Sequence, residues 1–284
     1  MPSMGKELCR QVTRALELPR HLRMARLESR LYIDEYSMGS NFNQILLEQA
    51  KLDYNKVQSL HQIELAELSR WWKQLGLVEK LKFGRDRPME CYFWTVGILP
   101  DLKYSQARIE LAKTIAILLV IDDIFDTYGS INELLLFNDA IQKWNLDAIE
   151  QLPAYMKICY MALYNNTNEI AYSILKEQGR NVLPSLKQVE EQDRGDNASS
   201  IPLFMKEKNL PSEDEARECI MQLIGNLWKE LNTELLSSSL PLPIIRACFN
   251  MSRTSQVIYQ HEEDSYSSGV DNFVKFLLLE PIGL

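Results

Sequence analysis

Apolar residues recur every three or four positions along most of the chain, which is the spacing of helices with one buried face. The pattern predicts helices over residues 43–77, 87–96, 105–128, 153–178, 212–236, 242–263 and 270–279. No stretch alternates between apolar and polar residues for long enough to predict a strand. The expected fold class is therefore all-α, an antiparallel bundle of helices.

Capping signals set several boundaries of these helices. Ser130 is followed by Glu133, and Ser212 by Glu215, at the spacing of a capping box. Gly179 follows a predicted helix as a C-terminal stop. Residues 190–200 are polar, contain a glycine and lack apolar anchors, so we expect a loop there and the next helix from position 212.

Composition narrows the classes of function. A chain of 284 residues with 46% hydrophobic and 25% charged residues is typical of one globular domain. The net charge of −8 argues against a nucleic-acid partner. The longest apolar run, residues 115–121, is too short to span a bilayer. The five cysteines are widely spaced and form no C-x-x-C pair, which favours buried thiols over disulfides or a zinc site.

An acidic cluster ends the predicted helix 105–128. On a helix Asp122 and Asp126 project from the same face, with Asp123 near its edge. Carboxylate oxygens suit Mg²⁺, which is commonly shared with substrate phosphates. The residues before the cluster are apolar almost all round, so we expect a buried helix on which these charges require a counter-charge. The alternative is a solvated acidic patch.

Two arginines precede this cluster in the chain. Arg85 and Arg87 flank Asp86 at the start of a predicted helix, an arrangement suited to a phosphate or diphosphate group. Asp86 could orient one of the arginines. The alternative is an ordinary surface ion pair.

Aromatic residues supply the remaining candidates. Trp94 either packs in the core or presents its indole face to a cation. Tyr259, Asp264 and Tyr266 form a polar and aromatic set near the C-terminus. The alternative for this set is a capped helix end with surface tyrosines.

Taken together, these segments resemble the class I terpene synthases of plants. The resemblance rests on LPRHLRMARLESRLYIDEY (18–36), ELSRWWKQLGL (67–77), RDRPMECYFWTVG (85–97), IDDIFDTYGS (121–130), QLPAYMKICYMALYN (151–165) and VIYQHEEDSYSSGVD (257–271), in family order and spacing. The resemblance covers nearly the whole chain, and the last segment is most similar in sequence to linalool and nerolidol synthases. It implies the helical bundle of isoprenoid synthases and a lyase that ionises geranyl or farnesyl diphosphate to a mono- or sesquiterpene olefin or alcohol.

The resemblance also implies roles for individual residues. Mg²⁺, or Mn²⁺ in its place, would be bound by Asp122 and Asp126 with Asp123 supporting. Residues implied to contact the prenyl diphosphate are Arg85, Arg87, Trp94, Asp122, Asp126, Tyr259, Asp264 and Tyr266. Of these, the two arginines and the two aspartates would act in catalysis. We further expect a monomer, located in the cytoplasm or a plastid.

Two departures from the family pattern limit these expectations. The catalytic-domain resemblance starts almost at Met1, so we expect the helical domain that precedes it in plant members to be absent. The second metal motif, (N/D)-D-x-x-(S/T)-x-x-x-E, is incomplete, and only Glu190 matches its terminal glutamate. We therefore predict that several helices are deleted near residues 186–190 and that turnover is low or absent.

Two rival functions remain. One is a non-catalytic helical protein that retains a surface for a prenyl diphosphate or a partner. The other is a chain-elongating prenyltransferase, which requires a second aspartate-rich motif that this sequence lacks.

Overall fold

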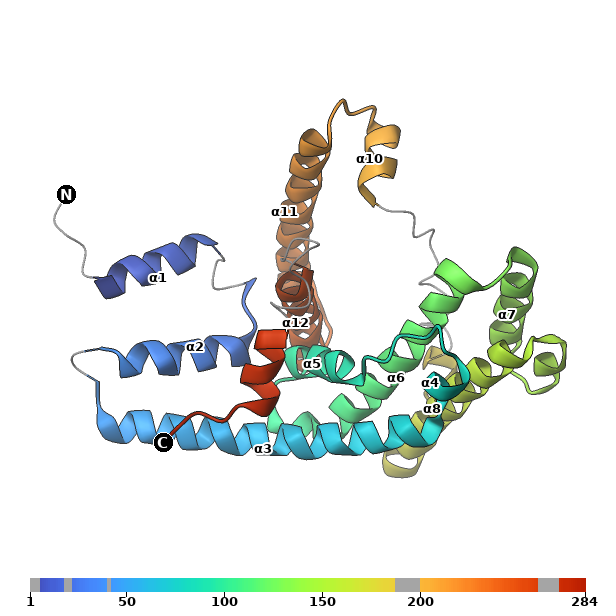
Figure 1. The fold of residues 1–284 in the computed structure, drawn as a ribbon, viewed down its shortest axis with the longest axis horizontal. Helices are drawn as coiled ribbons and strands as arrows, with labels where there is room; N and C mark the ends of the chain where they lie inside the picture. Colours follow the sequence, from blue (N-terminus) through green and yellow to red (C-terminus); the bar gives the residue numbers. More distant parts are fainter. Residues whose placement is uncertain (1–5, 18–21, 40–41, 187–199, 260–270) are drawn as a thin grey trace.

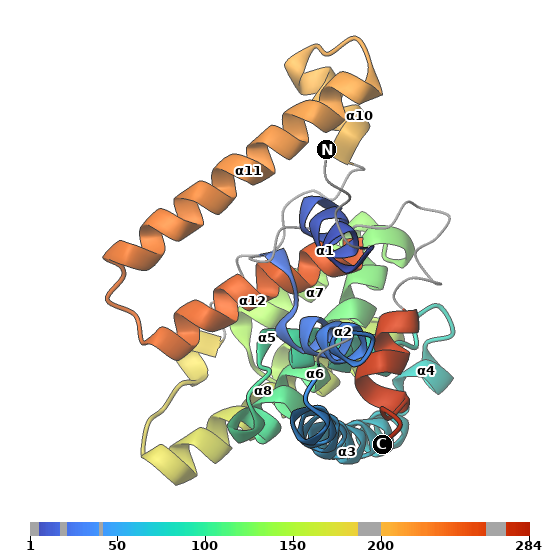
Figure 2. The ribbon, with the colours of Figure 1, turned by 90° about the vertical axis from the view of Figure 1, so that its left-hand side faces the viewer.

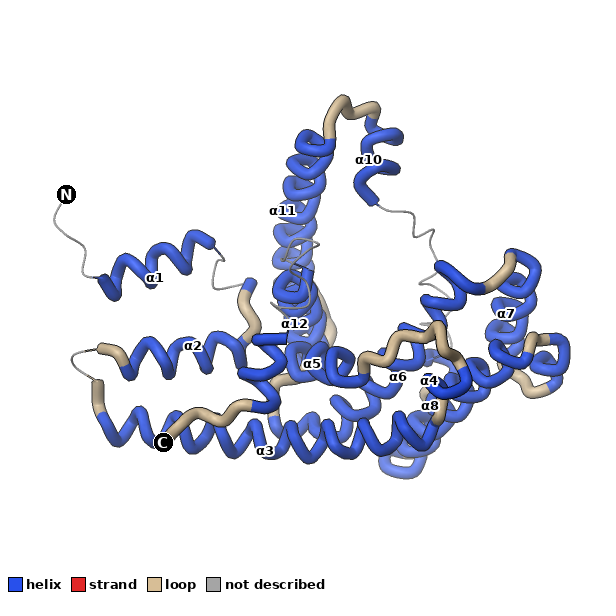
Figure 3. Tube along the Cα trace, in the orientation of Figure 1, coloured by secondary structure: helices blue, strands red, loops and turns tan. Residues whose placement is uncertain are grey.

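The computed structural model describes residues 6–17, 22–39, 42–186, 200–259 and 271–284, and within them it contains helices and no strand (Figures 1 and 3). The α-helices are α1 (Lys6–Glu17), α2 (Ala25–Ser37), α3 (Gln44–Leu75), α4 (Leu77–Lys80), α5 (Pro88–Ile98), α6 (Ser105–Asp123), α7 (Ile131–Lys143), α8 (Ala154–Gln178), α10 (Ser200–Lys208), α11 (Glu213–Ser237) and α12 (Leu242–Tyr259). Short turns of 3₁₀-helix are η2 (Leu102–Tyr104) and η4 (Asp147–Gln151), and short π-helices are η3 (Ile124–Tyr128) and η5 (Lys275–Leu279). The all-α prediction is confirmed.

Local signals explain most helix ends. The capping box at the start of α7 is present, with the Glu133 carboxylate accepting from the backbone nitrogen of Ser130 at 3.0 Å. Gly179 ends α8 in the left-handed region at φ 67°, which a glycine adopts without strain. The prediction that the next helix after residues 190–200 begins at position 212 is wrong, because α10 already begins at Ser200. This helix is too short to show a full periodic pattern in the sequence.

Helix α6 lies at the centre, in contact with α3, α5 and α8. Its residues on the buried face join two hydrophobic clusters, one with α7 and α8 and the other with α2, α3, α5 and α12. We expected α6 to be buried all round, and that expectation is wrong: Ile115, Leu118 and Leu119 are only partly buried. These three side chains pack against the first cluster but keep part of their surface exposed.

A buried ion pair ties α6 to α3. Arg108 is fully buried and Glu64 is 2% exposed, and the guanidinium donates to both carboxylate oxygens at 2.7 and 2.8 Å. The hydroxyl of Tyr92, on α5, donates to the same carboxylate. Helices α3, α5 and α6 are thus linked by one polar network.

The C-terminal segment is held against α3 by side chains that bond to its backbone. The donors follow the spacing of a helix, at i, i+3, i+4, i+7 and i+11, so they share one face of α3: Lys51, Tyr54, Asn55, Gln58 and Gln62. Their acceptors are backbone carbonyls between Phe276 and Gly283.

Helices α10 and α11 extend away from the rest of the molecule (Figures 1 and 2). Only Ala216 is buried among the α11 side chains that the structure describes. Trp228 contacts Phe249 of α12, with 6.1 Å between ring centroids. Among the described helices, none combines the length and apolar character needed to cross a membrane.

Candidate active site

The acidic cluster lies where α6 changes into the π-helix η3. Asp122 and Asp123 are the last residues of α6, and Asp126 lies within η3. Ile124, between them, is fully buried, whereas Asp122 and Asp126 are exposed. Both carboxylates can therefore be reached from solvent, although Ile121 and Ile124 beside them are buried. Single π-helical turns are rare and frequently mark functional sites.

Residues 85–87, the arginine segment, lie against this acidic cluster. The guanidinium Nε of Arg85 lies 2.7 Å from Oδ1 of Asp123, and the backbone nitrogen of Arg85 donates to Oδ2 at 2.9 Å. A second guanidinium nitrogen donates to the carbonyl of Leu119 at 3.3 Å. Asp123 is only 15% exposed, so this ion pair is partly shielded from water. Two motifs separated by 38 residues in the chain thus form one surface.

The other two members of the arginine segment differ in their contacts. Asp86 accepts a hydrogen bond from the indole nitrogen of Trp72, on α3, at 2.9 Å. Its hydrogen-bond partner is therefore this tryptophan, whereas the sequence suggested an arginine. Arg87 is exposed at the N-cap of α5, and Pro88 follows it as the first helical residue. An exposed cation at a helix N-terminus provides a favourable electrostatic setting for an anion.

Two predicted aromatic residues lie together. Trp94, on α5, is half-buried and meets Tyr259, at the end of α12, edge to face with 6.1 Å between ring centroids. Tyr259 is 69% exposed. Their contact between two packed helices fits an aromatic wall, although the ring of Trp94 also packs on the second core cluster.

The sequence analysis missed an aromatic cluster beside the aspartates. Phe83 stacks on Tyr128 with 3.9 Å between ring centroids, and Tyr155 of α8 contacts both rings edge to face. The three residues come from separate parts of the chain, so no local sequence pattern predicts their contact. The only signal was proximity in sequence, since Phe83 precedes Arg85 and Tyr128 follows Asp126 by two residues.

Comparison with known proteins identifies the family. The metal-binding domain of the terpene synthase family matches residues 73–190. A chloroplastic monoterpene synthase of Cananga odorata is 51% identical over 99% of this chain, and a chloroplastic R-linalool synthase of Ocimum basilicum is 44% identical over the same share. Isoprene synthase of grey poplar, solved with three Mg²⁺ ions and dimethylallyl-S-thiolodiphosphate, superposes with a TM-score of 0.89 and 33% identity over 98% of this chain and 70% of its own. The chain belongs to the terpene synthase family.

This terpene synthase chain is shorter than its relatives. It spans 62% of the Cananga protein and 64% of the Ocimum protein. The match to the Cananga protein extends over 366 residues, whereas the chain has 284, so at least 82 aligned positions have no residue here. Part of the difference therefore lies inside the chain. The family match stops at Glu190.

The metal-binding capacity of the described part of this terpene synthase is limited. No three His, Cys, Asp or Glu side chains gather closely enough there to hold a metal. Asp122 and Asp126 are exposed hard-oxygen donors, whereas Asp123 faces Arg85. Two carboxylates fit an Mg²⁺ that takes its other ligands from water and substrate phosphates. Glu190, Asp264 and Tyr266 lie outside the described residues, so their assignments stay predictions.

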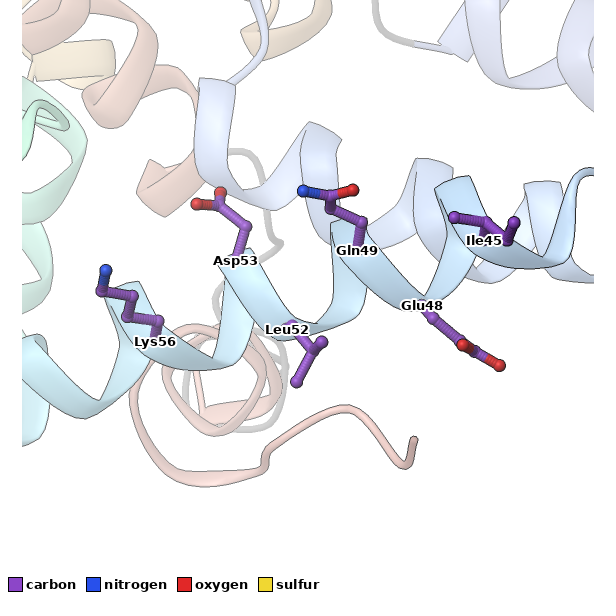
Figure 4. A pocket seen from close by; sticks show the side chains of 6 residues that line it. All are labelled: Ile45, Glu48, Gln49, Leu52, Asp53 and Lys56. Atoms are coloured by element: carbon purple, nitrogen blue, oxygen red, sulfur yellow. The ribbon is translucent and has the colours of Figure 1, made fainter.

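A shallow depression of about 400 Å³ opens elsewhere, on the N-terminal half of α3 (Figure 4). Its lining residues are Ile45, Glu48, Gln49, Leu52, Asp53 and Lys56. None of them is a predicted site residue, and the depression therefore does not define the active site of this terpene synthase.

Proposed function

We propose that the chain is a terpene synthase that binds Mg²⁺ and ionises geranyl or farnesyl diphosphate to a mono- or sesquiterpene olefin or alcohol such as linalool or nerolidol. The observation that carries this proposal is the ion pair between Arg85 and Asp123. It joins a cationic segment that suits a diphosphate to a carboxylate cluster that suits the metal. Ionisation of a diphosphate needs both charges at one place.

In this reaction Asp122 and Asp126 would hold the metal, and Mn²⁺ could replace Mg²⁺ with the same oxygen ligands. The bound metal would neutralise negative charge that develops on the departing diphosphate. Arg87, exposed at the start of α5, would contact the diphosphate, and Arg85 would do so from its position on Asp123. Asp123 then positions an arginine as well as supporting the metal site.

The hydrocarbon part of the substrate would lie beside Trp94 and Tyr259. The face of an aromatic ring carries negative potential, so these rings would stabilise an allylic cation and exclude water from it. Asp264 and Tyr266 would complete the mouth or floor of the pocket. Capture of the cation by water or loss of a proton would then end the reaction.

We further propose that the aligned positions with no residue in this chain include the second metal motif and several helices, lost near residues 186–190. The family match that ends at Glu190 supports this location. Without the opposing wall, the diphosphate is clamped from one side, so we expect little or no turnover. The second candidate function follows from the same observation: a catalytically inactive helical protein that still binds a prenyl diphosphate or a partner.

Location and assembly are also proposals. The relatives from Cananga and Ocimum are chloroplastic, which supports a plastid over the cytoplasm for this chain. We expect a monomer.

One assay tests the proposal. The purified chain is incubated with Mg²⁺ and geranyl or farnesyl diphosphate, and volatile products, released diphosphate and ligand binding are measured. We expect Mg²⁺-dependent binding that Asp122→Ala abolishes. Asp139→Ala, which removes a carboxylate of α7 that is 48% exposed, should leave this binding unchanged.

Three results would change the proposal. Abundant volatile product would show that the missing wall is dispensable. Binding that does not depend on Mg²⁺ or on Asp122 would refute the metal site. A longer prenyl diphosphate, formed after isopentenyl diphosphate is added, would assign the chain to the elongating prenyltransferases.

A further inference from the structure

The arginine segment and the aspartate cluster are joined at two points. The first is the ion pair between Arg85 and Asp123. The second is the stack of Phe83 on Tyr128, whose rings are 15° from parallel with centroids 3.9 Å apart. Phe83 lies two residues before Arg85, and Tyr128 lies two residues after Asp126. The stack therefore connects the backbone on either side of the candidate metal site.

Tyr155 closes this contact from α8. Its ring meets Tyr128 at 83° and 5.3 Å, and Phe83 at 86° and 6.0 Å. Its hydroxyl donates to Glu133, the capping residue of α7, at 3.3 Å. Burial, followed by the nearby Glu133 carboxylate, raises the pKa of Tyr155 to about 12, so the hydroxyl keeps its proton at neutral pH. We call Phe83, Tyr128 and Tyr155 the aromatic clasp.

The π-helix η3 depends on contacts of this kind. It has five residues and ends with a hydrogen bond from Gly129 to the carbonyl of Ile124 at 2.7 Å. A single π-turn has little stability of its own, so its position is set by what packs against it. A Cβ atom at Gly129 would lie 2.9 Å from the same carbonyl and 2.7 Å from Leu134. The backbone that follows Tyr128 is thus tightly confined.

We propose that the aromatic clasp is a positioning element for the metal site. This inference rests on the proposed function, and none of the three rings is assigned a contact with substrate. By fixing η3 against the segment before Arg85, the clasp holds Asp126 where it can share a divalent cation with Asp122 and a diphosphate. Loosening the clasp weakens the metal site without removing a ligand.

The test measures Mn²⁺ binding to the whole chain by electron paramagnetic resonance, with inorganic pyrophosphate present. Tyr128→Leu should weaken Mn²⁺ binding by about tenfold, because it removes two aromatic contacts. Tyr128→Phe keeps the rings in contact and should bind as the wild type does. Tyr172→Leu is the matched control, since Tyr172 is 66% exposed on α8 and Tyr128 is 55% exposed.

Several outcomes would overturn the inference. One is equal Mn²⁺ affinity in Tyr128→Leu and Tyr172→Leu. Another is equal weakening in Tyr128→Leu and Tyr128→Phe, which would assign the effect to the hydroxyl. If Tyr128→Leu does not fold, Phe83→Leu probes the same stack from its other side and is held to the same criteria.

Failure of the proposed function is recognisable separately. If the wild type and Asp122→Ala bind Mn²⁺ with equal affinity, the proposed metal site is refuted. In that case hydrogen exchange of the Gly129 amide decides the inference. We expect faster exchange in Tyr128→Leu than in Tyr128→Phe, and unchanged exchange would refute the positioning role.

Discussion

Replacing Arg108 with methionine should strongly destabilise the fold while keeping most of the side-chain volume. The change removes the cation from a fully buried ion pair and leaves the Glu64 carboxylate, 2% exposed, without its bidentate donor. Arg108 also donates to the carbonyls of Leu99 and Asp101 at 2.8 and 2.7 Å. Those two acceptors lose their donors as well.

The magnitude follows from burial. Removing one partner of a buried ion pair costs about 3–5 kcal/mol, because the other charge stays buried without compensation. Domains are stable by roughly 5–15 kcal/mol, so the loss is about a fifth of the stability or more. In thermal unfolding this corresponds to a Tm lower by about 10 °C. Tyr92 still donates to the carboxylate, which places the cost near the lower limit.

Acid stability gives a second measure. Burial raises the pKa of Glu64, but hydrogen bonds from Arg108, Ser105 and Tyr92 outweigh it and hold this pKa below its usual 4.5. The ion pair's stabilisation is therefore complete above pH 4.5 and is lost as the pH falls through the lower folded-state value. In Arg108→Met this acid-dependent loss should shrink, because the folded-state pKa of Glu64 rises when burial is no longer outweighed by its principal donor.

The assay is urea unfolding followed by far-UV circular dichroism. The control is Lys143→Met, which breaks an exposed pair of 2.6 Å with Asp139 and should cost less than about 1 kcal/mol. Adding Glu64→Gln to Arg108→Met should recover part of the loss by removing the uncompensated charge. The reasoning fails if Arg108→Met destabilises no more than Lys143→Met, or if the double variant shows the sum of the two single effects.

Three further predictions concern stability. Burial, followed by the charge of Arg108, lowers the pKa of His61 from 6.5 to about 4. Between these two pH values the His61 side chain is protonated in the unfolded chain but not in the folded one. The free energy of unfolding should therefore fall by up to roughly 3 kcal/mol as the pH drops through this interval. Urea unfolding of His61→Leu at several pH values should lack this slope. Asn55→Ala removes both hydrogen bonds between the Asn55 amide and the backbone of Ile282, each 2.8 Å. It should weaken the attachment of the C-terminal segment by about 1–3 kcal/mol, measured as faster hydrogen exchange of the C-terminal amides. Gly97→Ala would place a Cβ atom 2.2 Å from a threonine hydroxyl of α12 and should cost about 1–3 kcal/mol in thermal unfolding.

Two of these predictions have a control variant. Gly225→Ala, on α11, meets no atom within 4 Å and should stabilise the helix by roughly 0.5–1 kcal/mol. Ser59→Ala removes an exposed hydrogen bond to the Asn55 carbonyl and should leave C-terminal exchange unchanged. A pH slope that persists in His61→Leu would assign the effect to other groups, and equal melting of Gly97→Ala and wild type would contradict the close packing of α5 and α12.

The sequence by itself determined the helices and the chemical types at the site. Helix signals act over three or four residues, so the capping box at Ser130 and the stop at Gly179 could be predicted from neighbours alone. The acidic and basic motifs were likewise visible as residue types at fixed spacing. The family resemblance drawn from them is confirmed by the match to the terpene synthase family.

Only the tertiary structure decided what these residues contact. Asp123 meets Arg85 across 38 residues, and Arg108 meets Glu64 across 44, because packed helices bring their positions together. Such contacts depend on how α3, α5 and α6 fill one core, and this information is not local. The π-turn at Asp126 follows the same rule, since surrounding contacts rather than helix propensity set its geometry. Residue types and local helices were therefore encoded along the chain, whereas the partners of each charge were fixed by packing.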